Sequence, residues 1–600
     1  MMRRLLSVVL GGLLLLSAFP ATADITTTDL NALAEYYPAD TVGFASIRTD
    51  QAYIDTLDSL FERAVAYLPA SQRPPIGLTD LADSGVQIIG LTSVSELTDL
   101  LGATAAAGIW LDPDLGLNGD PRFLISAQVS NPAELIDLID VQTAQLVEAD
   151  QLKRTDDDGT IIYTTTESFN GTPIAAAVTA DALLLSQELA MLGLDGFDRT
   201  LASADDFSAA YDRLPENDYN VGAYINTAPL QDVVEETPEL ADLPDVIDRI
   251  NQSTRPTVIG ATLLDDDTLA VDVATSVDGA VYEELGITQY EPTPVDVDFA
   301  RHVPADAPLV VFGTGIGPGL QATFDNLRSI SETISESGGL SALIDPTGTL
   351  LADDERLILD SVDPALAIGA FSLPFATGTG LSLERDVFPV IDGNAAFYVR
   401  VIPTDPESQL AFFTPAIPDF ALVIETSDPE GAAAIVEQLG TAADLYDTPL
   451  PQEAYGNGNT LVFPTLDLVQ FGTSNELDLL LGASDDLIVF GTRTGATEAV
   501  VPQATLGDNA AYQRAQSYFL PDTSQVWYIG TEPILESLIF LAETGELPLS
   551  ILGDFYRTIS LVESSSITSS VSDGGSTAVI RAVITLSPEP RDLLEELDAE

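Results

Sequence analysis

The chain has 600 residues, of which 46% are hydrophobic and 19% are charged, a balance that is typical of globular protein and argues against disorder. Its 94 acidic residues against 22 basic ones give a formal net charge of −72, and Lys153 is its single lysine. Because phosphate binding needs clustered Lys and Arg, this composition predicts no nucleic-acid partner and makes anionic lipid surfaces poor partners. The acidic surface attracts cations instead, and cysteine is absent, which excludes disulfides and thiol chemistry.

The N-terminal residues 1–23 are typical of a secretory signal peptide. Arg3 and Arg4 precede the apolar run 5–16, and residues 21–23 form a small-x-small cleavage site. We expect cleavage after residue 23 and export, so that the protein is secreted, periplasmic or associated with the cell surface. An uncleaved anchor is the alternative, but the run is short for a span of ~20 residues. Beyond it, the sequence predicts no transmembrane anchor in the mature chain.

Several sequence patterns occur twice and in the same order. The tripeptide Pro-Ala-Asp precedes an apolar run at residues 38–40 and again at 304–306. Internal similarity of this kind predicts a tandem duplication. In chain order, the similar pairs are 36–50 with 302–315, 122–139 with 419–436, 178–185 with 482–489, 209–215 with 510–521, and 224–229 with 528–533.

A chain of 600 residues is too long to fold around a single hydrophobic core, so two or more domains are expected. The repeated patterns indicate where the chain divides. The segment around residue 290 carries two prolines and several acids with little periodicity, as a linker does. The predicted order is a signal peptide at 1–23, a first α+β repeat domain at 24–290, a linker at 291–299, a second α+β repeat domain at 300–590 and a short acidic C-terminal helix at 591–600.

Within each half, the patterns mix strands and helices. Residues 122–130 alternate apolar and polar side chains, which indicates a half-buried strand. Asn131-Pro132 and Asp428-Pro429 each place a capping side chain before a proline at a predicted helix start.

Hairpins follow these helices. The triple aspartates at 156–158 and 265–267 lie between predicted strands, as hairpin tips do. The halves contain too few helices for a regular βαβ series. We therefore predict the α+β class, with two homologous domains, each a mainly antiparallel sheet with helices packed on one face.

The Pro-Ala-Asp opening, the unit of a strand, Ser-Asn/Asp-Pro and a helix, and the Tyr-Ile-x-Thr-x-Pro element at 224–229 and 528–533 resemble the secreted bacterial proteins grouped as domain of unknown function 3352. The resemblance covers most of the mature chain, once in each half. It implies an exported envelope protein, and it brings no catalytic residue or cofactor with it.

One loop has the composition of a calcium site. Asp112, Asp114, Asn118 and Asp120 supply oxygens at the short alternating spacing that calcium prefers. The loop does not match the twelve-residue calcium-loop pattern, and its counterpart at 403–413 keeps few of the acids. A chance cluster in an acidic chain is the alternative, and calcium is the single cofactor that the sequence raises.

We expect structural roles for the remaining candidate residues. His302 is the single histidine, but it corresponds to Tyr36 in the first half and is expected to be an ordinary residue before a strand. The glycine-rich segment 313–319 lacks dinucleotide-loop spacing and predicts a turn. Trp110 and Trp527 lie in apolar strand patterns, for which core packing is expected.

These observations favour an exported, non-enzymatic protein with a binding or scaffolding role. No nucleophile and base pair stands out, since the chain has one histidine and no Gly-x-Ser-x-Gly. The alternatives are a carboxylate-dependent hydrolase of extracellular polymers and a carrier of an apolar ligand.

Overall fold

The computed structural model describes most of the chain between residues 26 and 588. The described residues are 26–66, 73, 77, 79–80, 83, 86–87, 91–111, 121–166, 174–229, 253–284, 286–336, 364–404, 415–446, 448–456, 458–463, 478–501, 504–544, 556 and 559–588. The predicted signal peptide, C-terminal helix and calcium loop at 112–120 lie outside them.

The chain divides into two compact units. The first comprises residues 1–242 and 251–277, and the second comprises 243–250 and 278–600. The expected linker at 291–299 belongs to the second unit, where it has no regular structure until a 3-10 helix begins at Val297.

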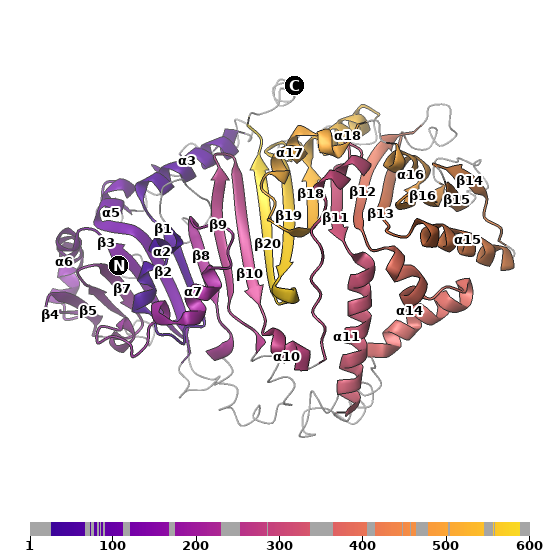
Figure 1. Cartoon of the computed structure of the whole chain (residues 1–600). Helices are drawn as coiled ribbons and strands as arrows, with labels where there is room; N and C mark the ends of the chain where they lie inside the picture. The colour runs from indigo at the N-terminus through magenta and orange to yellow at the C-terminus, as the bar shows by residue number, and fades with distance from the viewer. Residues whose placement is uncertain are drawn as a thin grey trace. The chain divides into compact units, whose positions relative to one another are not determined.

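The strands of the first unit form one antiparallel sheet in the order β4-β5-β6-β7-β3-β2-β1-β8-β9-β10 (Figure 1). Their bounds are β1 Gly43–Arg48, β2 Leu101–Trp110, β3 Arg122–Val129, β4 Leu152–Asp157, β5 Thr160–Thr165, β6 Ala175–Val178, β7 Ala182–Ser186, β8 Val221–Ile225, β9 Thr257–Asp265 and β10 Thr268–Ser276.

The strands of the second unit pair in the same order, β14-β15-β16-β17-β13-β12-β11-β18-β19-β20, and all of these pairings are antiparallel. Its strands are β11 Leu309–Thr314, β12 Asn394–Pro403, β13 Ala416–Glu425, β14 Gln452–Tyr455, β15 Gly458–Phe463, β16 Leu479–Ser484, β17 Leu487–Thr492, β18 Thr523–Gly530, β19 Val562–Ser572 and β20 Thr577–Leu586. The combination of helices with antiparallel strands confirms the predicted α+β class.

Helices connect the strands in both units. Those of the first are α2 Thr27–Leu30, η1 Ala32–Tyr36, α3 Gln51–Ala66, α5 Val94–Leu100, α6 Pro132–Glu148, η4 Leu189–Leu192, η5 Leu201–Ser203 and α7 Asp205–Tyr211. Those of the second are α10 Gly279–Glu284, η6 Val297–His302, α11 Ile316–Glu336, α14 Pro364–Thr379, η7 Leu383–Val387, η8 Phe388–Val390, α15 Pro429–Leu445, α16 Arg493–Val500, η11 Leu506–Asp508, α17 Ala510–Gln516, α18 Thr531–Glu543 and η12 Asp573–Gly575.

The predicted helix starts are confirmed at α6 and α15. The Asn131 side chain accepts a hydrogen bond from the backbone N–H of Glu134, and the Asp428 side chain accepts one from Gly431. Proline occupies the first turn of each helix. Side-chain acceptors of this kind satisfy backbone donors that have no partner within the helix.

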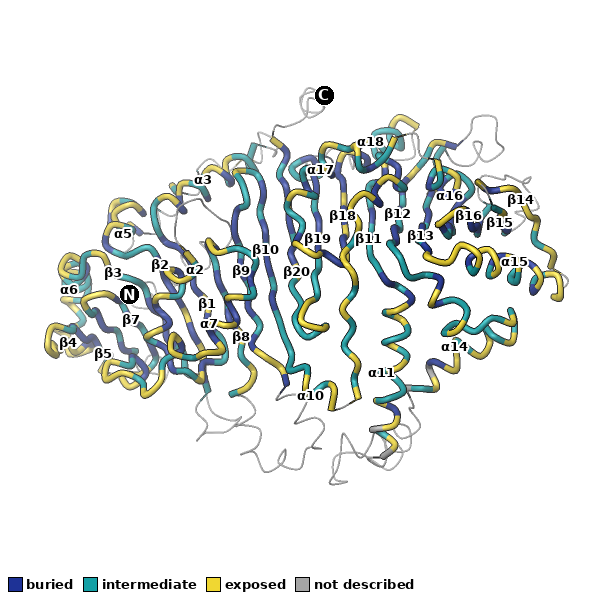
Figure 2. The backbone as a smooth tube through the Cα atoms, in the orientation of Figure 1, coloured by how far each residue is buried: buried dark blue, intermediate teal, exposed yellow. Residues whose placement is uncertain are grey.

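Helices pack on both faces of each sheet, and the expectation of a single covered face is therefore wrong. In the first unit, Phe44 of β1 contacts the rings of Tyr37 and Phe207, whereas Ile47 packs with residues of α3. Successive strand residues point to opposite faces, so these two residues of β1 serve two different layers. Figure 2 shows the resulting alternation of burial along the strands.

The core of the second unit lies between the sheet and helices η6, α16 and α17. It includes buried side chains of the central strands, such as Phe312, Tyr398, Val526 and Tyr528. Among the helices that the structure describes, none has the length and apolarity needed to cross a membrane.

Candidate binding surface

The Pro-Ala-Asp motif forms the same clamped turn in both units. Pro38 makes an isolated antiparallel bridge with Thr200, and Pro304 makes one with Thr505. In each unit, the residue after that threonine donates its backbone N–H to the carbonyl of the residue before the proline, over 2.8 Å. The motif therefore fixes the entry of the first strand to a distant segment, and its role is structural.

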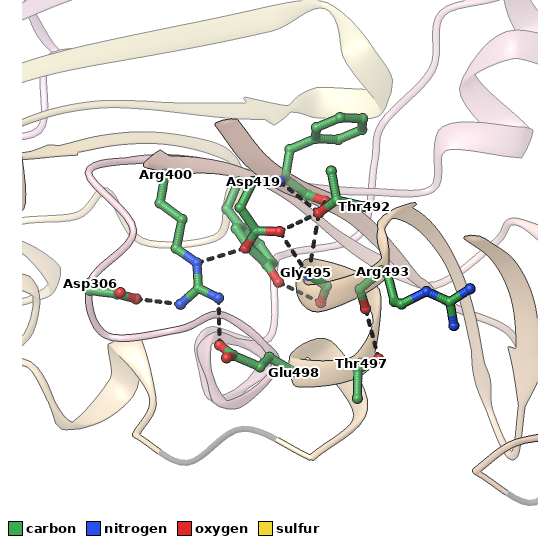
Figure 3. A network of polar contacts seen from close by, with 10 residues as sticks. Asp306, Arg400, Asp419, Thr492, Arg493, Gly495, Thr497 and Glu498 are labelled. Carbon is green, nitrogen blue, oxygen red and sulfur yellow. Dashed lines mark hydrogen bonds and ion pairs between the residues drawn. The ribbon is translucent and has the colours of Figure 1, made fainter. Parts of the chain in front are cut away.

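A buried ion-pair network lies behind the second of these turns (Figure 3). Arg400 of β12 is 5% exposed, and its guanidinium donates to three carboxylates. The donor–acceptor distances are 2.7 Å to Asp306, 2.8 Å to Asp419 and 2.6 Å to Glu498. One cation thus connects the Pro-Ala-Asp turn, the neighbouring strand β13 and helix α16.

Asp419 extends this network to the start of α16. Its second carboxylate oxygen accepts the backbone N–H of Gly495 over 2.8 Å and the hydroxyl of Thr492, the N-cap residue. The hydroxyl of Tyr398 donates to the carbonyl of the same glycine, also over 2.8 Å. A carboxylate at a helix N-terminus is stabilised both by these donors and by the helix dipole.

The protonation states of Arg400 and Tyr398 suit a structural ion-pair network better than a reaction centre. Burial alone would lower the pKa of Arg400, but the carboxylates of Asp306 and Asp419 raise it above its ordinary value. Burial also raises the pKa of Tyr398, so its hydroxyl keeps its proton. Arg400 remains a cation and Tyr398 remains a neutral donor at neutral pH, which leaves neither available as a base.

In the first unit, the residue at the position that corresponds to Arg400 is uncharged. Gly43 of β1 pairs with Ile109 in the same register in which Leu309 of β11 pairs with Val399. The next residue along the partner strand is therefore Trp110 in place of Arg400. Trp110 is 4% exposed, which confirms its predicted core packing.

The opposite face of the second sheet carries an apolar surface, which we call the apolar strip. One row crosses four adjacent strands through the pairs Phe397 with Val311, Val311 with Trp527, and Trp527 with Ile567. A second row lies two residues further along β12, β11 and β18, and it reaches Ile584 of β20 through Ser565 of β19. The strip comprises Phe397, Val311, Trp527 and Ile567 with Val399, Leu309, Ile529 and Ile584.

The strip is exposed on β18, β19 and β20 and half-buried on β11 and β12, whereas the other face of the same strands is closed. Trp527 is 46% exposed and Ile567 is 48% exposed, while the neighbours Val526 and Tyr528 are each 1% exposed. Exposed side chains that form a contiguous apolar patch mark an interaction surface more often than scattered ones do.

The core packing predicted for Trp527 is wrong. The run Val526-Trp527-Tyr528-Ile529 resembles a strand that is buried on both faces. In the structure only alternate members of that run reach the core, because helices cover that side of β18 alone. Helix α15 covers the strip-side face farther along the sheet, where it packs on β15 and β16.

His302 lies at the end of η6, outside the strip. Its Nδ1 is 3.0 Å from the carbonyl oxygen of Ala499, and its ring contacts that of Phe299. Burial lowers its pKa below the ordinary value. Among the described residues, no group of three or more His, Cys, Asp or Glu side chains is arranged to hold a metal ion.

The glycine-rich segment joins β11 to α11, as a turn between a strand and a helix. Gly315 has a φ of +59°, and its carbonyl accepts a hydrogen bond from the hydroxyl of Tyr290. A Cβ atom at Gly317 would overlap the backbone oxygen of Phe388. The glycines therefore serve backbone geometry and close packing, in agreement with the predicted turn.

Both triple aspartates lie at hairpin tips, as predicted. Asp158 and Gly159, between β4 and β5, have positive φ angles, which suit a tight turn. Between β9 and β10, Asp267 also forms an ion pair with Arg63 of α3. This second role was not visible in the sequence, because about two hundred residues separate the partners.

Comparisons with known proteins place the chain in a family. The sequence profile of a family described as "Protein of unknown function (DUF3352)" matches residues 4–579 in one span. No curated protein matches significantly. A solved structure described as crystal form III of TP0453 matches at 12% identity over 44% of this chain and 89% of that chain. The TM-score of this match is 0.22. The family match covers far more than half of the chain, which therefore belongs to this DUF3352 family.

Proposed function

We propose that this chain is an exported, non-enzymatic binding protein and that the apolar strip of the second unit is its partner surface. The observation that carries the proposal is the exposure of Trp527 within a registered row of apolar side chains. The polar network on the other face supports it, because that network consists of satisfied structural contacts. Export rests on the signal-peptide pattern at residues 1–23.

The geometry of the strip suits a protein partner. Five neighbouring strands, β12, β11, β18, β19 and β20, present bulky side chains on one pleated face, and tryptophan is enriched among the residues that dominate interface affinity. The chain carries a net charge of −72, so charge complementarity favours a partner with basic residues around its own apolar patch. Basic residues around the partner's patch would raise the rate at which the two proteins associate, and they would make that rate dependent on salt concentration.

The two units are best explained by duplication followed by divergence. Their sheets share one strand order, and both begin with the clamped Pro-Ala-Asp turn. In the first unit the row that corresponds to Phe397, Val311 and Trp527 consists of alanines, namely Ala107, Ala45 and Ala223. We propose that the second unit became the binding unit by acquiring bulky side chains on this face.

Site-specific photo-crosslinking tests the proposal. A benzophenone amino acid in place of Trp527 should give one reproducible adduct in cells that export the protein, and an Ile567→Asp substitution should abolish it. The same probe in place of Val141, an isolated side chain that is 73% exposed on α6, is the control. Equal adducts at both positions, or an adduct at 527 that survives Ile567→Asp, would contradict the proposal.

A further inference from the structure

Helix α14 is an exposed apolar helix in a strongly acidic chain. Residues 364–383, which include all of α14, contain no charged residue. Three of its large side chains face solvent, with Leu366 63%, Phe371 73% and Leu373 64% exposed. A helix that is apolar on all sides is normally found in a protein core or in contact with lipid.

The exposed side chains occupy a wide arc of the helix. At about 100° per residue, Leu366 and Leu373 lie within about 20° of each other, and Phe371 lies about 140° away from Leu366. Ile368, which is 6% exposed, is on the side that packs into the protein, where α14 lies against α11 (Figure 1). A flat protein surface would leave part of such an arc in water, whereas a fluid medium would cover all of it.

The side-chain hydroxyls of α14 are paired within the helix. Its hydroxyl side chains are Ser372, Thr377 and Thr379, and each donates to the carbonyl four residues earlier, over 2.7 to 2.9 Å. Hydroxyls that are paired in this way carry little desolvation cost in a medium without water. The hydroxyls of α14 therefore do not oppose its contact with an apolar medium.

The charges that follow the helix are paired as well. Glu384 forms an ion pair with Arg328 of α11, and Arg385 forms one with Asp386 over 2.8 Å. The C-terminal end of α14 is held by Gln438 of α15, which donates to the carbonyl of Thr379 over 3.0 Å. The helix is therefore anchored to the protein at this end, with its exposed arc directed outward.

We propose that α14 docks this protein onto the interface of an electrically neutral, zwitterionic lipid bilayer. The chain's net charge of −72 disfavours a second copy and an anionic lipid surface as occupants. A helix of 16 residues is about 24 Å long, less than the ~30 Å hydrocarbon core, so α14 is too short to cross the bilayer and is placed at its interface. This docking is independent of the partner surface on the apolar strip.

A single-site fluorescent probe tests the docking directly. The chain has no cysteine, so a Leu366→Cys variant carries one thiol for an environment-sensitive dye. Adding phosphatidylcholine vesicles should shift the emission of this dye to shorter wavelength. The same dye at Leu445→Cys, at the 79%-exposed end of α15, should not respond. No shift at 366, an equal shift at 445, or an emission already shifted without vesicles would overturn the proposal.

Vesicle flotation supplies a second readout. The wild-type protein should float with phosphatidylcholine vesicles, and the double variant Phe371→Asp, Leu373→Asp should lose at least about tenfold in binding, because burial of each side chain contributes about that factor. Trp527→Asp should float like the wild type. A wild-type protein that does not float, or an α14 double variant whose oligomeric state changes while flotation does not, would overturn the proposal.

Discussion

Arg400 on β12 donates to the carboxylate of Asp306, the aspartate of the second Pro-Ala-Asp turn, over a distance of 2.7 Å. This bond joins the entrance of the second sheet to the network that holds α16 through Asp419 and Glu498. The motif therefore has two roles in the second unit, a turn and an ion-pair partner. In the first unit it serves as a turn beside the buried Trp110.

Arg400→Met should lower the free energy of unfolding of the second unit by about 3 kcal/mol, because it leaves the buried carboxylate of Asp419 without its cation. Urea denaturation followed by circular dichroism measures the change. Arg514→Met is the matched control, since its ion pair with Glu563 is partly exposed and contributes less than about 1 kcal/mol. Equal losses of unfolding free energy in the two variants would contradict a stabilising role for the Arg400 network.

The two Pro-Ala-Asp aspartates should respond differently to truncation. Asp306→Ala removes a partly exposed partner of Arg400 and should cost about 1 kcal/mol of stability. Asp40→Ala should change stability very little, because Trp110 occupies the position that corresponds to the arginine. Thermal unfolding of the two variants side by side checks this, and a larger loss for Asp40→Ala would refute it.

His302 should make the second unit less stable in mild acid. Burial lowers its pKa below the ordinary 6.5, so below that pH the unfolded chain takes up a proton that the folded chain resists. The stabilisation is complete above pH 6.5 and declines as the pH falls through 6.5 toward the lower pKa of the folded state. As the chain has one histidine, a single imidazole resonance reports this pKa by NMR. His302→Gln should remove the pH-dependent loss, and a folded-state pKa at or above 6.5 would contradict the account.

Gly317→Ala should destabilise the second unit by about 1–3 kcal/mol, because the added methyl group would overlap the backbone oxygen of Phe388. Gly369→Ala is the contrasting substitution. It lies in the interior of α14, where a Cβ atom meets no neighbour, and should stabilise the helix by about 0.5–1 kcal/mol. Melting temperatures that moved in the same direction would show that packing at Gly317 is misassigned.

Local chemistry explains which features of the fold could be predicted from the sequence. The caps at Asn131 and Asp428 and the turn at Asp158-Gly159 depend on residues close together in the chain, and the structure has them as expected. The α+β class follows from the same local patterns. The order of the strands does not, because it depends on pairings between distant segments.

The candidate surface illustrates what local patterns cannot supply. Trp527 lies in an apolar run, and its exposure depends on which face of β18 the helices cover.

The partners of Arg400 are 19 to 98 positions away along the chain, so no spacing in the sequence indicated these ion pairs. The predicted calcium loop at 112–120 lies outside the described residues and stays a prediction.

Acrylamide quenching of tryptophan fluorescence tests the open apolar strip most directly, because the chain has two tryptophans. In a Trp110→Phe variant, Trp527 should emit at long wavelength and be quenched readily, as a side chain 46% exposed. In a Trp527→Phe variant, Trp110 should emit at shorter wavelength and resist quenching, as a side chain 4% exposed. If Trp527 proved as protected as Trp110, the protein would cover the strip itself, and the proposed binding surface would be contradicted.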